Sequence, residues 1–292
     1  MGEAIGVLLA IISSALGGTA AAITRYLVGN ADAITLAILR WGIGIACVLP
    51  TALFFRSKFP PRRDLLAITS LGFCFFGVFF VLYNVAVSFT TAARASLALS
   101  TLPLQTMLIG SLLGFEQLTA RKTLGVCIAV FGVIAALGAG LSSAPSGAWK
   151  GELIMTGAVL CNAFYNVLSR PFIQRSSPLG FLAIGMGAGA IGLMIIGVLT
   201  GRVAILATFG PHQWLAGIYL GVGGGALAFI LWVLALQRTT PTRVATTITV
   251  NPIAAGLLAA HIVGEPVTLP LIAGLFAVFV GIWIAATDAR TA

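Results

Sequence analysis

The chain has 292 residues, a net charge of +9, 59% hydrophobic residues and only 8% charged residues. Its mean hydropathy of +1.10 lies far above that of soluble globular domains and excludes an ordinary soluble protein. The basic excess does not indicate nucleic-acid binding, because the basic residues lie at the ends of apolar runs. A bilayer core of about 30 Å needs about 20 apolar residues per helix, so this length suits about ten membrane spans.

Ten apolar runs, separated by charged or Gly/Pro/Ser-rich turns, predict ten membrane-spanning helices. In chain order they cover 4–24, 33–55, 65–87, 95–115, 121–141, 152–169, 179–200, 214–236, 244–263 and 270–287. Backbone groups in lipid must bond within their own segment, and the weak alternation of polarity excludes a barrel, so these spans are predicted to be helices. The first run follows Glu3 without a preceding Lys or Arg, which is typical of a retained helix and not of a cleavable signal.

The basic residues predict the orientation of the chain. With a cytoplasmic N-terminus, eleven Lys and Arg residues fall in cytoplasmic segments and four fall on the opposite side. Those four are Arg25, Arg94, Lys150 and Arg202, while Arg40 lies inside the second span. The positive-inside rule therefore predicts a multi-pass protein of a bacterial inner membrane with both termini in the cytoplasm.

The chain offers little catalytic chemistry. Its four cysteines stand alone in apolar runs, and its two histidines, His212 and His261, have no Asp, Glu or Cys cluster beside them. The sequence therefore predicts no catalytic residue, no metal and no cofactor, and an integral-membrane enzyme is a distant alternative. The expected partners are a small-molecule substrate and the lipid bilayer, with no nucleic acid, and the chain is expected to be a monomer.

An internal repeat organises the chain. Spans three to five match spans eight to ten without a gap at an offset of 149 residues. The pairs include Arg94 with Arg243, Pro103 with Pro252, Glu116 with Glu265, Gly125 with Gly274, and Glu3 with Glu152. Five helices per half is an odd number, so we expect inverted-topology repeats at 1–147 and 148–292 in an all-α integral membrane fold. This architecture is typical of carriers with alternating access.

The repeated segments resemble a known family. TTAAR, a mid-helix Pro and GFEQLTARKTLGVCIAVFGV in the first half, with TTPTR, Pro252 and GEPVTLPLIAGLFAVFVG in the second, resemble the EamA-type module of the drug/metabolite transporter superfamily. Among ten-helix members the chain is most similar to the YddG-type aromatic amino-acid exporters. The resemblance implies a basket of ten helices around a central cavity lined by spans one, three, four, six, eight and nine, with spans five and ten at the periphery. It also implies export of a small organic solute such as an amino acid.

Two prolines interrupt matching spans. Pro103 and Pro252 lie in the middle of the fourth and ninth spans, and each removes a backbone donor and loosens the preceding turn. Carbonyl groups near Leu99–Ser100 and Ile248–Thr249 are therefore predicted to be free for a ligand or for gating. The alternative is a kink that only shapes helix packing.

Polar side chains at mid-membrane are costly unless they face a partner or a wet cavity, so they are the candidates for substrate binding. They are Ser13, Ser14, Ser100, Thr101, Gln105, Asn162, Asn166, Thr249 and Asn251. The hydroxyl groups have an alternative role, because Ser and Thr also bond to their own helix. For the amides of Gln105, Asn162 and Asn251 we favour the cavity.

Aromatic residues are candidates for an apolar wall, which the side chain of an amino acid would need. The spacing of Phe76, Phe79, Phe80 and Tyr83 places them on one helical face, and Tyr165 of the sixth span is a further candidate. The alternative is a stripe that faces lipid or a neighbouring helix.

Two basic side chains have two readings each. Arg40 either attracts an anionic substrate or snorkels and caps a carbonyl, and the structural role is favoured because the second span is not among the implied cavity helices. His261 is either a contact for the substrate or a hydrogen-bonded structural residue, and the structural role is favoured.

The acidic residues all lie at span ends. This distribution argues against proton-coupled expulsion of cations and favours facilitated transport down the substrate's own gradient. A multidrug transporter and a sugar-phosphate or metabolite exchanger are the alternatives, although bound phosphate favours several membrane-depth Lys or Arg residues.

Overall fold

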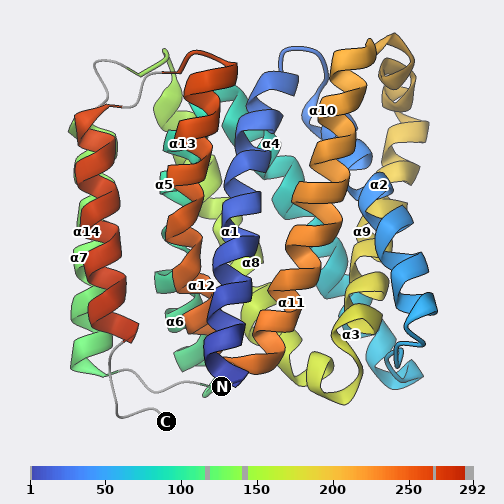
Figure 1. The fold of residues 1–292 in the computed structure, drawn as a ribbon, viewed down its shortest axis with the longest axis horizontal. Helices are drawn as coiled ribbons and strands as arrows, with labels where there is room; N and C mark the ends of the chain where they lie inside the picture. The colour runs from blue at the N-terminus through green and yellow to red at the C-terminus, as the bar shows by residue number, and fades with distance from the viewer. Residues whose placement is uncertain (1, 116–118, 140–143, 266–267, 287–292) are drawn as a thin grey trace.

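The computed structural model describes residues 2–115, 119–139, 144–265 and 268–286, and this part of the chain is helical without a strand (Figure 1). Eight helical segments in the described residues are long and apolar enough to cross a membrane. They confirm an all-α membrane fold and match eight of the ten predicted runs. The other two runs form α7 (Ala120–Ala139) and α14 (Leu269–Ala286), which are also helical.

The bounds of the remaining elements follow the predicted spans closely. In the first half they are α1 (Gly2–Leu27), α2 (Ala33–Phe54), α3 (Arg62–Gly72), η1 (Phe73–Phe79), α4 (Phe80–Phe89), α5 (Ala92–Leu99) and α6 (Leu102–Leu112). In the second half they are α8 (Ala148–Arg175), α9 (Pro178–Leu199), η3 (Arg202–Thr208), α10 (Pro211–Gly221), η4 (Val222–Leu227), α11 (Ala228–Arg238), α12 (Pro241–Thr246), η5 (Thr247–Thr249) and α13 (Val250–Ile262).

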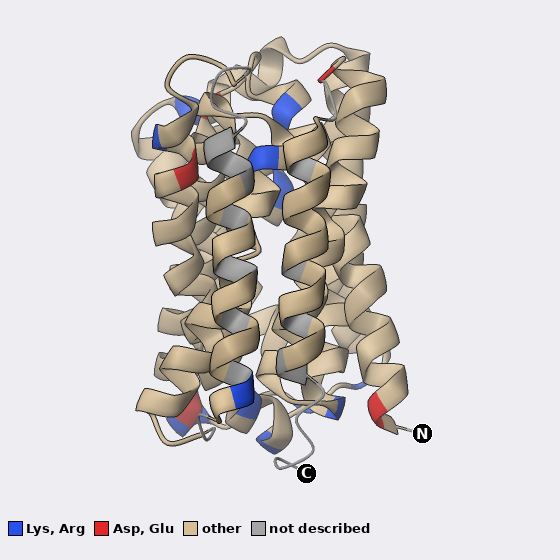
Figure 2. Ribbon diagram, turned by 90° about the vertical axis from the view of Figure 1, so that its left-hand side faces the viewer, with Lys and Arg blue, Asp and Glu red and all other residues tan. Residues whose placement is uncertain are grey.

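Corresponding helices of the two halves run in opposite directions. In Figure 1, α1 begins at the lower face and α8 begins at the upper face. We call the face where α1 begins the N-terminal face and the opposite one the far face. Charged residues gather toward these two ends of the helices, as Figure 2 shows. The helices α7 and α14 pack against each other at one edge of the molecule (Figure 1), where the resemblance placed spans five and ten.

Departures from α-helical geometry recur at repeat-related positions. The third and eighth spans each contain a π-helical segment, and η1 and η4 begin 149 residues apart, at Phe73 and Val222. The fourth span breaks between Leu99 and Leu102, and the ninth contains the 3₁₀ turn η5. Both interruptions lie just before the repeated prolines. Because π-helical turns occur frequently at functional sites, these segments indicate that the functional site lies in the middle of the bundle.

Glycines allow two helix pairs to approach closely. A Cβ atom on Gly72 of α3 would overlap the backbone of Gly185 in α9. At the second contact, between η4 and α2, a Cβ on Gly225 would lie 3.3 Å from the carbonyl oxygen of Arg40. Small residues at helix contacts favour tight backbone packing in lipid, where van der Waals contact replaces the hydrophobic effect between helices.

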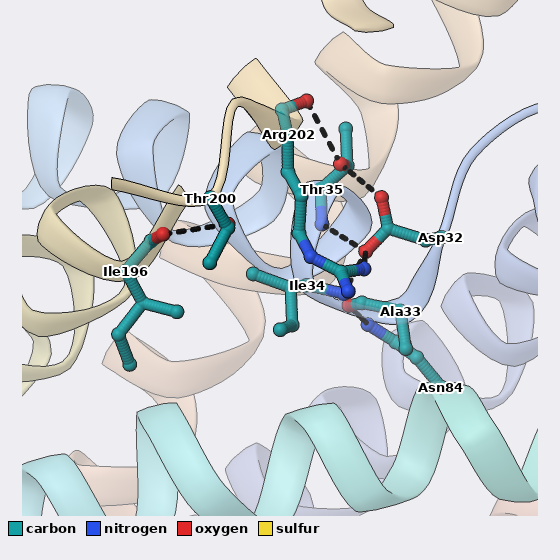
Figure 3. Close-up of polar contacts among 8 residues, drawn as sticks. All are labelled: Asp32, Ala33, Ile34, Thr35, Asn84, Ile196, Thr200 and Arg202. Carbon is teal, nitrogen blue, oxygen red and sulfur yellow. Dashed lines mark hydrogen bonds and ion pairs between the residues drawn. The ribbon is translucent and has the colours of Figure 1, made fainter. Parts of the chain in front are cut away.

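An acidic cap ties three elements together at the far face (Figure 3). Asp32 caps α2 by accepting hydrogen bonds from the backbone of Ile34 and Thr35, and it pairs with Nη1 of Arg202 at 2.6 Å. Nearby, Asn84 of α4 donates to the carbonyl of Ala33 at 2.8 Å. Burial acts to raise the pKa of Asp32, but the bonds from Thr35 and Arg202 outweigh it and hold the pKa below its ordinary value of 3.8.

Candidate functional site

A buried cavity of about 50 Å³ lies halfway along the helices, between the two halves of the chain. This volume gives room for a few water molecules. It is lined by Ser13, Ser14, Gly17, Arg40, Phe75, Phe79, Phe80, Tyr83, Leu99, Asn162, Ala228, Phe229, Trp232, Ile248 and Asn251. Spans one, two, three, four, six, eight and nine therefore contribute to the wall.

The cavity has the symmetry of the repeat. Ten of the fifteen lining residues form five pairs at the offset of 149. The pairs are Ser13 with Asn162, Phe79 with Ala228, Phe80 with Phe229, Tyr83 with Trp232, and Leu99 with Ile248. Each half thus supplies an equivalent part of the wall, so the cavity belongs to the interface between the halves and not to either half alone.

The serine and asparagine side chains of the wall come from α1, α8 and α13. Ser13 Oγ donates to the carbonyl of Ala228 at 2.7 Å, and Ser14 shares a hydrogen bond of 3.0 Å with Thr247. In contrast, the buried amide oxygens of Asn162 and Asn251 have no hydrogen-bond partner in the described structure. A buried acceptor without a partner costs free energy, so these two amides are suited to receive a ligand's donors.

The aromatic residues that line the cavity differ at one position from the predicted aromatic stripe. The spacing of an α-helix predicts Phe76 on the same face as Phe79 and Tyr83, but the cavity is lined by Phe75 in its place. Phe76 instead packs edge-on against Trp41, with ring centroids 4.9 Å apart. The physical reason is the π-helical segment η1, whose wider turns change the angle between successive side chains.

Besides Phe76, six predicted candidates lie outside the cavity wall: Ser100, Thr101, Gln105, Tyr165, Asn166 and Thr249. Ser100 and Thr249 donate to carbonyls of their own helices, at 3.1 and 3.0 Å. Gln105 reaches across to the carbonyl of Thr156 in α8 at 2.9 Å. Tyr165 is fully buried and stacks on Phe75 at 4.2 Å, directly behind the wall. These side chains connect and support the helices that carry the cavity.

The prolines and the histidine also lie apart from the cavity wall. Pro103 is in the first turn of α6, immediately after the break in the fourth span, and Pro252 lies two residues into α13 after η5. His261 is exposed in the last turn of α13. Pro103 and Pro252 thus adjoin the irregular backbone around Leu99 and Ile248, which line the cavity.

Arg40 is the one charged residue among those that line the cavity. Its side chain is only 3% exposed, and its Nη2 atom donates to the carbonyl of Gly224 in η4 at 2.6 Å. The guanidinium carbon lies 4.6 Å from the ring centroid of Phe80 and 5.0 Å from that of Trp41. The second span therefore reaches the cavity, although it is not among the helices that the resemblance implied.

Repeat-related ion pairs join the halves at both faces of the molecule. At the far face, Arg94 of α5 pairs with Glu152 of α8 at 2.6 Å, and both side chains are 10% exposed. At the N-terminal face, Arg243 of α12 pairs with Glu3 of α1, and these side chains are 34% and 55% exposed. We call these contacts the far-face pair and the N-face pair.

A further ion pair strengthens the far face. Arg25 pairs with Glu265 at 2.9 Å, and the other carboxylate oxygen of Glu265 accepts from the backbone of Ala92 at 3.0 Å. Glu116, the repeat partner of Glu265, lies outside the described residues. Glu265 lies at a span end, as the sequence predicts for the acidic residues, and it connects α1 to α5.

Sequence reasoning missed Phe229 and Trp232 of α11. The signal was present, because shifting Phe80 and Tyr83 by the repeat offset of 149 leads directly to them. Gly17 and Phe75 had no such signal, because their repeat partners, Asn166 and Gly224, differ in type.

Inverted halves that enclose a buried site at mid-depth define a membrane transporter of the inverted-repeat class. The chain belongs to the EamA-like transporter family, whose family model matches residues 4–138 and 149–287. This membership agrees with the EamA-type resemblance and with a transport function.

Relatives and a solved structure extend this finding. The uncharacterized transporter YyaM of Bacillus subtilis is 22% identical over 89% of this chain and 86% of its own. A protein of Streptantibioticus cattleyicolor described as a probable terminal-alkyne amino-acid exporter is 25% identical, covering 74% and 71% of the two chains. A probable amino-acid metabolite efflux pump of Salmonella typhimurium is 25% identical over 85% and 84%. A crystal structure with 20% identity superposes over 99% of this chain and 97% of its own with a TM-score of 0.71, which supports the fold.

Proposed function

We propose that the protein exports small organic solutes, foremost neutral amino acids with aromatic or other apolar side chains, by alternating access. The observation that carries this proposal is the pairing of cavity residues by the offset of 149. Because inverted halves supply equivalent walls, an exchange of conformation between them would turn the same cavity from one face to the other. The far-face and N-face pairs, which are repeat-related, would then open and close in turn.

The chemistry of the wall supports an amino acid as the substrate. Asn162 and Asn251 present unpartnered amide oxygens, and aromatic rings of the third and eighth spans supply an apolar surface. Two relatives carry names that include amino-acid or amino-acid-metabolite export. Binding of cationic drugs is less suited to this site, because the lining residues include no carboxylate.

The absence of a carboxylate from the lining also bears on energy coupling. A proton-coupled carrier needs a titratable group that both faces reach, and the lining offers no Asp, Glu or His. We therefore propose facilitated export, driven by the gradient of the solute, by a monomer in a bacterial inner membrane with both termini in the cytoplasm. Strict proton antiport with a fixed stoichiometry in liposomes would contradict this coupling.

The test of the proposed function is transport by the purified chain in liposomes. Liposomes preloaded with labelled phenylalanine, leucine, glucose or a cationic dye are compared for release over protein-free liposomes. Saturable release of the amino acids alone is the expected result. Release of the dye or the sugar without the amino acids would contradict the proposal.

A matched pair of variants connects transport to the cavity. Asn162→Ala removes an amide from the wall and is expected to lower amino-acid release roughly tenfold, since a hydrogen bond to a charged group contributes about 1.5–3 kcal/mol. Asn30→Ala makes the same exchange at an exposed residue after α1 and is expected to behave as the wild type. Equal transport by both variants would remove Asn162 from the site.

A further inference from the structure

The cavity holds a buried cation that the structure does not neutralise. Arg40 is 3% exposed, and its Nε atom has no hydrogen-bond partner among the described residues. A guanidinium group has five N–H donors, and the described structure gives Arg40 one hydrogen bond, from Nη2 to the carbonyl of Gly224. A structural arginine would be expected to have more of its donors satisfied at this depth, so the remaining donors are open to a ligand.

No carboxylate of the described residues pairs with Arg40. Glu3, Asp32, Asp64, Glu152 and Glu265 are each bound to another arginine. The rings of Phe80 and Trp41 attract the guanidinium group through their faces but carry no formal charge. The cavity therefore has an uncompensated positive charge in a surrounding of low polarity, where an anionic group would be bound strongly.

The local fold holds Arg40 in place for such a role. The π-helical segment η4 contains Gly224, whose carbonyl anchors Nη2, and a Cβ on Gly224 would come within 2.4 Å of the Cβ of Ala20 in α1. The glycine thus lets α1 pack closely against η4, and the anchor fixes the orientation of the guanidinium group. A fixed planar group with free donors is suited to bind a carboxylate through two parallel hydrogen bonds.

The rest of the wall is complementary to a carboxylate solute that also carries an ammonium group. The unpartnered amide oxygens of Asn162 and Asn251 accept hydrogen bonds, which is what an ammonium group offers. The aromatic residues provide the apolar surface between these polar groups. Donors for an anion and acceptors for a cation are therefore present in one cavity.

We propose that Arg40 binds the carboxylate of the transported solute and thereby restricts transport to solutes that have a free carboxylate group. This inference rests on the proposed transport function and names the specificity-determining residue of the same cavity. It makes α2, through one side chain, a part of the substrate site.

The experiment compares two probes that differ in this one group. Phenylalanine has a free carboxylate, whereas phenylalaninamide keeps the ring and the ammonium group but has a neutral amide in its place. Initial rates of release from liposomes are measured at about pH 6, where both amines are largely protonated, and the rate of protein-free liposomes is subtracted. Wild-type protein is expected to release phenylalanine at least roughly tenfold faster than phenylalaninamide, since charge-assisted hydrogen bonds contribute about 1.5–3 kcal/mol.

Variants then assign the preference to Arg40. Arg40→Gln is expected to reduce the ratio of the two rates by roughly tenfold or more, and Arg40→Lys to give an intermediate ratio, because it keeps the charge without the planar fork. Arg238→Gln, at an exposed arginine that bonds to the carbonyl of Leu234 in its own helix, is the matched control with the wild-type ratio. The ratio does not depend on how much of a variant folds.

The outcomes separate the two proposals. Equal wild-type rates for both probes would overturn the role of Arg40 and leave transport intact, as would an unchanged ratio in Arg40→Gln. If Arg40→Gln does not fold, the wild-type ratio alone still decides whether a free carboxylate is required. Wild-type protein that releases neither probe faster than protein-free liposomes would contradict the proposed transport function itself.

Discussion

The two ends of the molecule carry the same ion pair in different surroundings. The far-face pair of Arg94 and Glu152 is nearly buried, whereas its repeat counterpart, the N-face pair of Arg243 and Glu3, is largely exposed. The far face is further joined by Arg25 with Glu265 and by Asp32 with Arg202. Two ion pairs of the same residue types can therefore contribute differently to stability, because burial determines how strongly water screens a charge.

This asymmetry is informative because the sequence repeat alone predicts two equivalent ends. An alternating carrier needs ends that are equivalent in composition but unequal in any one conformation. The structure shows such an inequality in the burial of the repeat-related pairs, although the N-terminal face also has a second ion pair, Arg175 with Asp64 at 3.1 Å. Under the proposed mechanism, the burial of the two pairs would interchange when the cavity turns to the other face.

The largest expected effect follows from breaking the far-face pair. Glu152→Gln leaves Arg94 buried beside a neutral amide, and loss of one partner from a buried pair costs about 3 kcal/mol. We expect a clear fall in the midpoint of thermal unfolding in detergent. The exchange Arg94→Glu with Glu152→Arg should recover part of the loss, and a wild-type midpoint for Glu152→Gln would show that the pair contributes little.

Smaller effects on the free energy of unfolding are expected at a repeat-related pair of threonines, and the two substitutions are expected to differ in sign. Thr239 donates to Glu3 at 3.3 Å, whereas the buried hydroxyl of Thr90 has no partner within the part of the chain that the structure describes. Thr239→Val should lower the free energy of unfolding by about 0.5–1 kcal/mol, and Thr90→Val should leave it unchanged or raise it by up to about 1 kcal/mol. Chemical denaturation of the two variants side by side measures the difference, and equal destabilisation would contradict the contrast between the ends.

Breaking the N-face pair should have a still smaller effect. Glu3 is 55% exposed, so Glu3→Gln removes an interaction that solvent already screens, and the expected loss is about 0.5 kcal/mol or less. The thermal midpoint of this variant should stay near that of the wild type at moderate salt. A loss of stability as large as that of Glu152→Gln would contradict the difference between the two ends of the molecule.

The smallest expected effect is a pH dependence at the far face. The pKa of Asp32 is held below its ordinary value of 3.8 by Thr35 and Arg202, so the stabilisation is complete above that value and is lost as the pH falls through the lowered pKa. Lowering the pH from about 5 to about 3 should therefore reduce the thermal midpoint by less in Asp32→Asn than in the wild type. Identical pH profiles would contradict this contribution.

Much of the fold could be predicted from apolar runs and from the repeat. The run at 33–55 became α2 at Ala33–Phe54, because lipid-depth helices are bounded by polar turns. The predicted run at 152–169 is shorter than α8, which continues to Arg175. The apolar stretch stops before Arg170, but the helical hydrogen bonds continue beyond it. Span ends that carry charged residues are therefore the least predictable part.

The candidate site was only partly predictable. Asn162 and Asn251 were identifiable because amides at lipid depth are rare and costly. The sequence could not predict that Phe75 lines the cavity in place of Phe76, because side-chain spacing does not specify a π-helical turn. The role of Arg40 depends on the close approach of α2 to η4, which the glycines at 221 and 225 permit but do not by themselves predict.

The most direct test of the central claim asks whether the cavity is reached from both faces. Ser13→Cys is placed in a variant lacking the four native cysteines and reconstituted in oriented liposomes, and an impermeant thiol reagent is added from one side at a time. We expect modification from either side, slowed by a transported solute, with Glu152→Gln raising the rate from the far face. Modification from one side only, whatever solute is present, would contradict a site that alternates between the two faces.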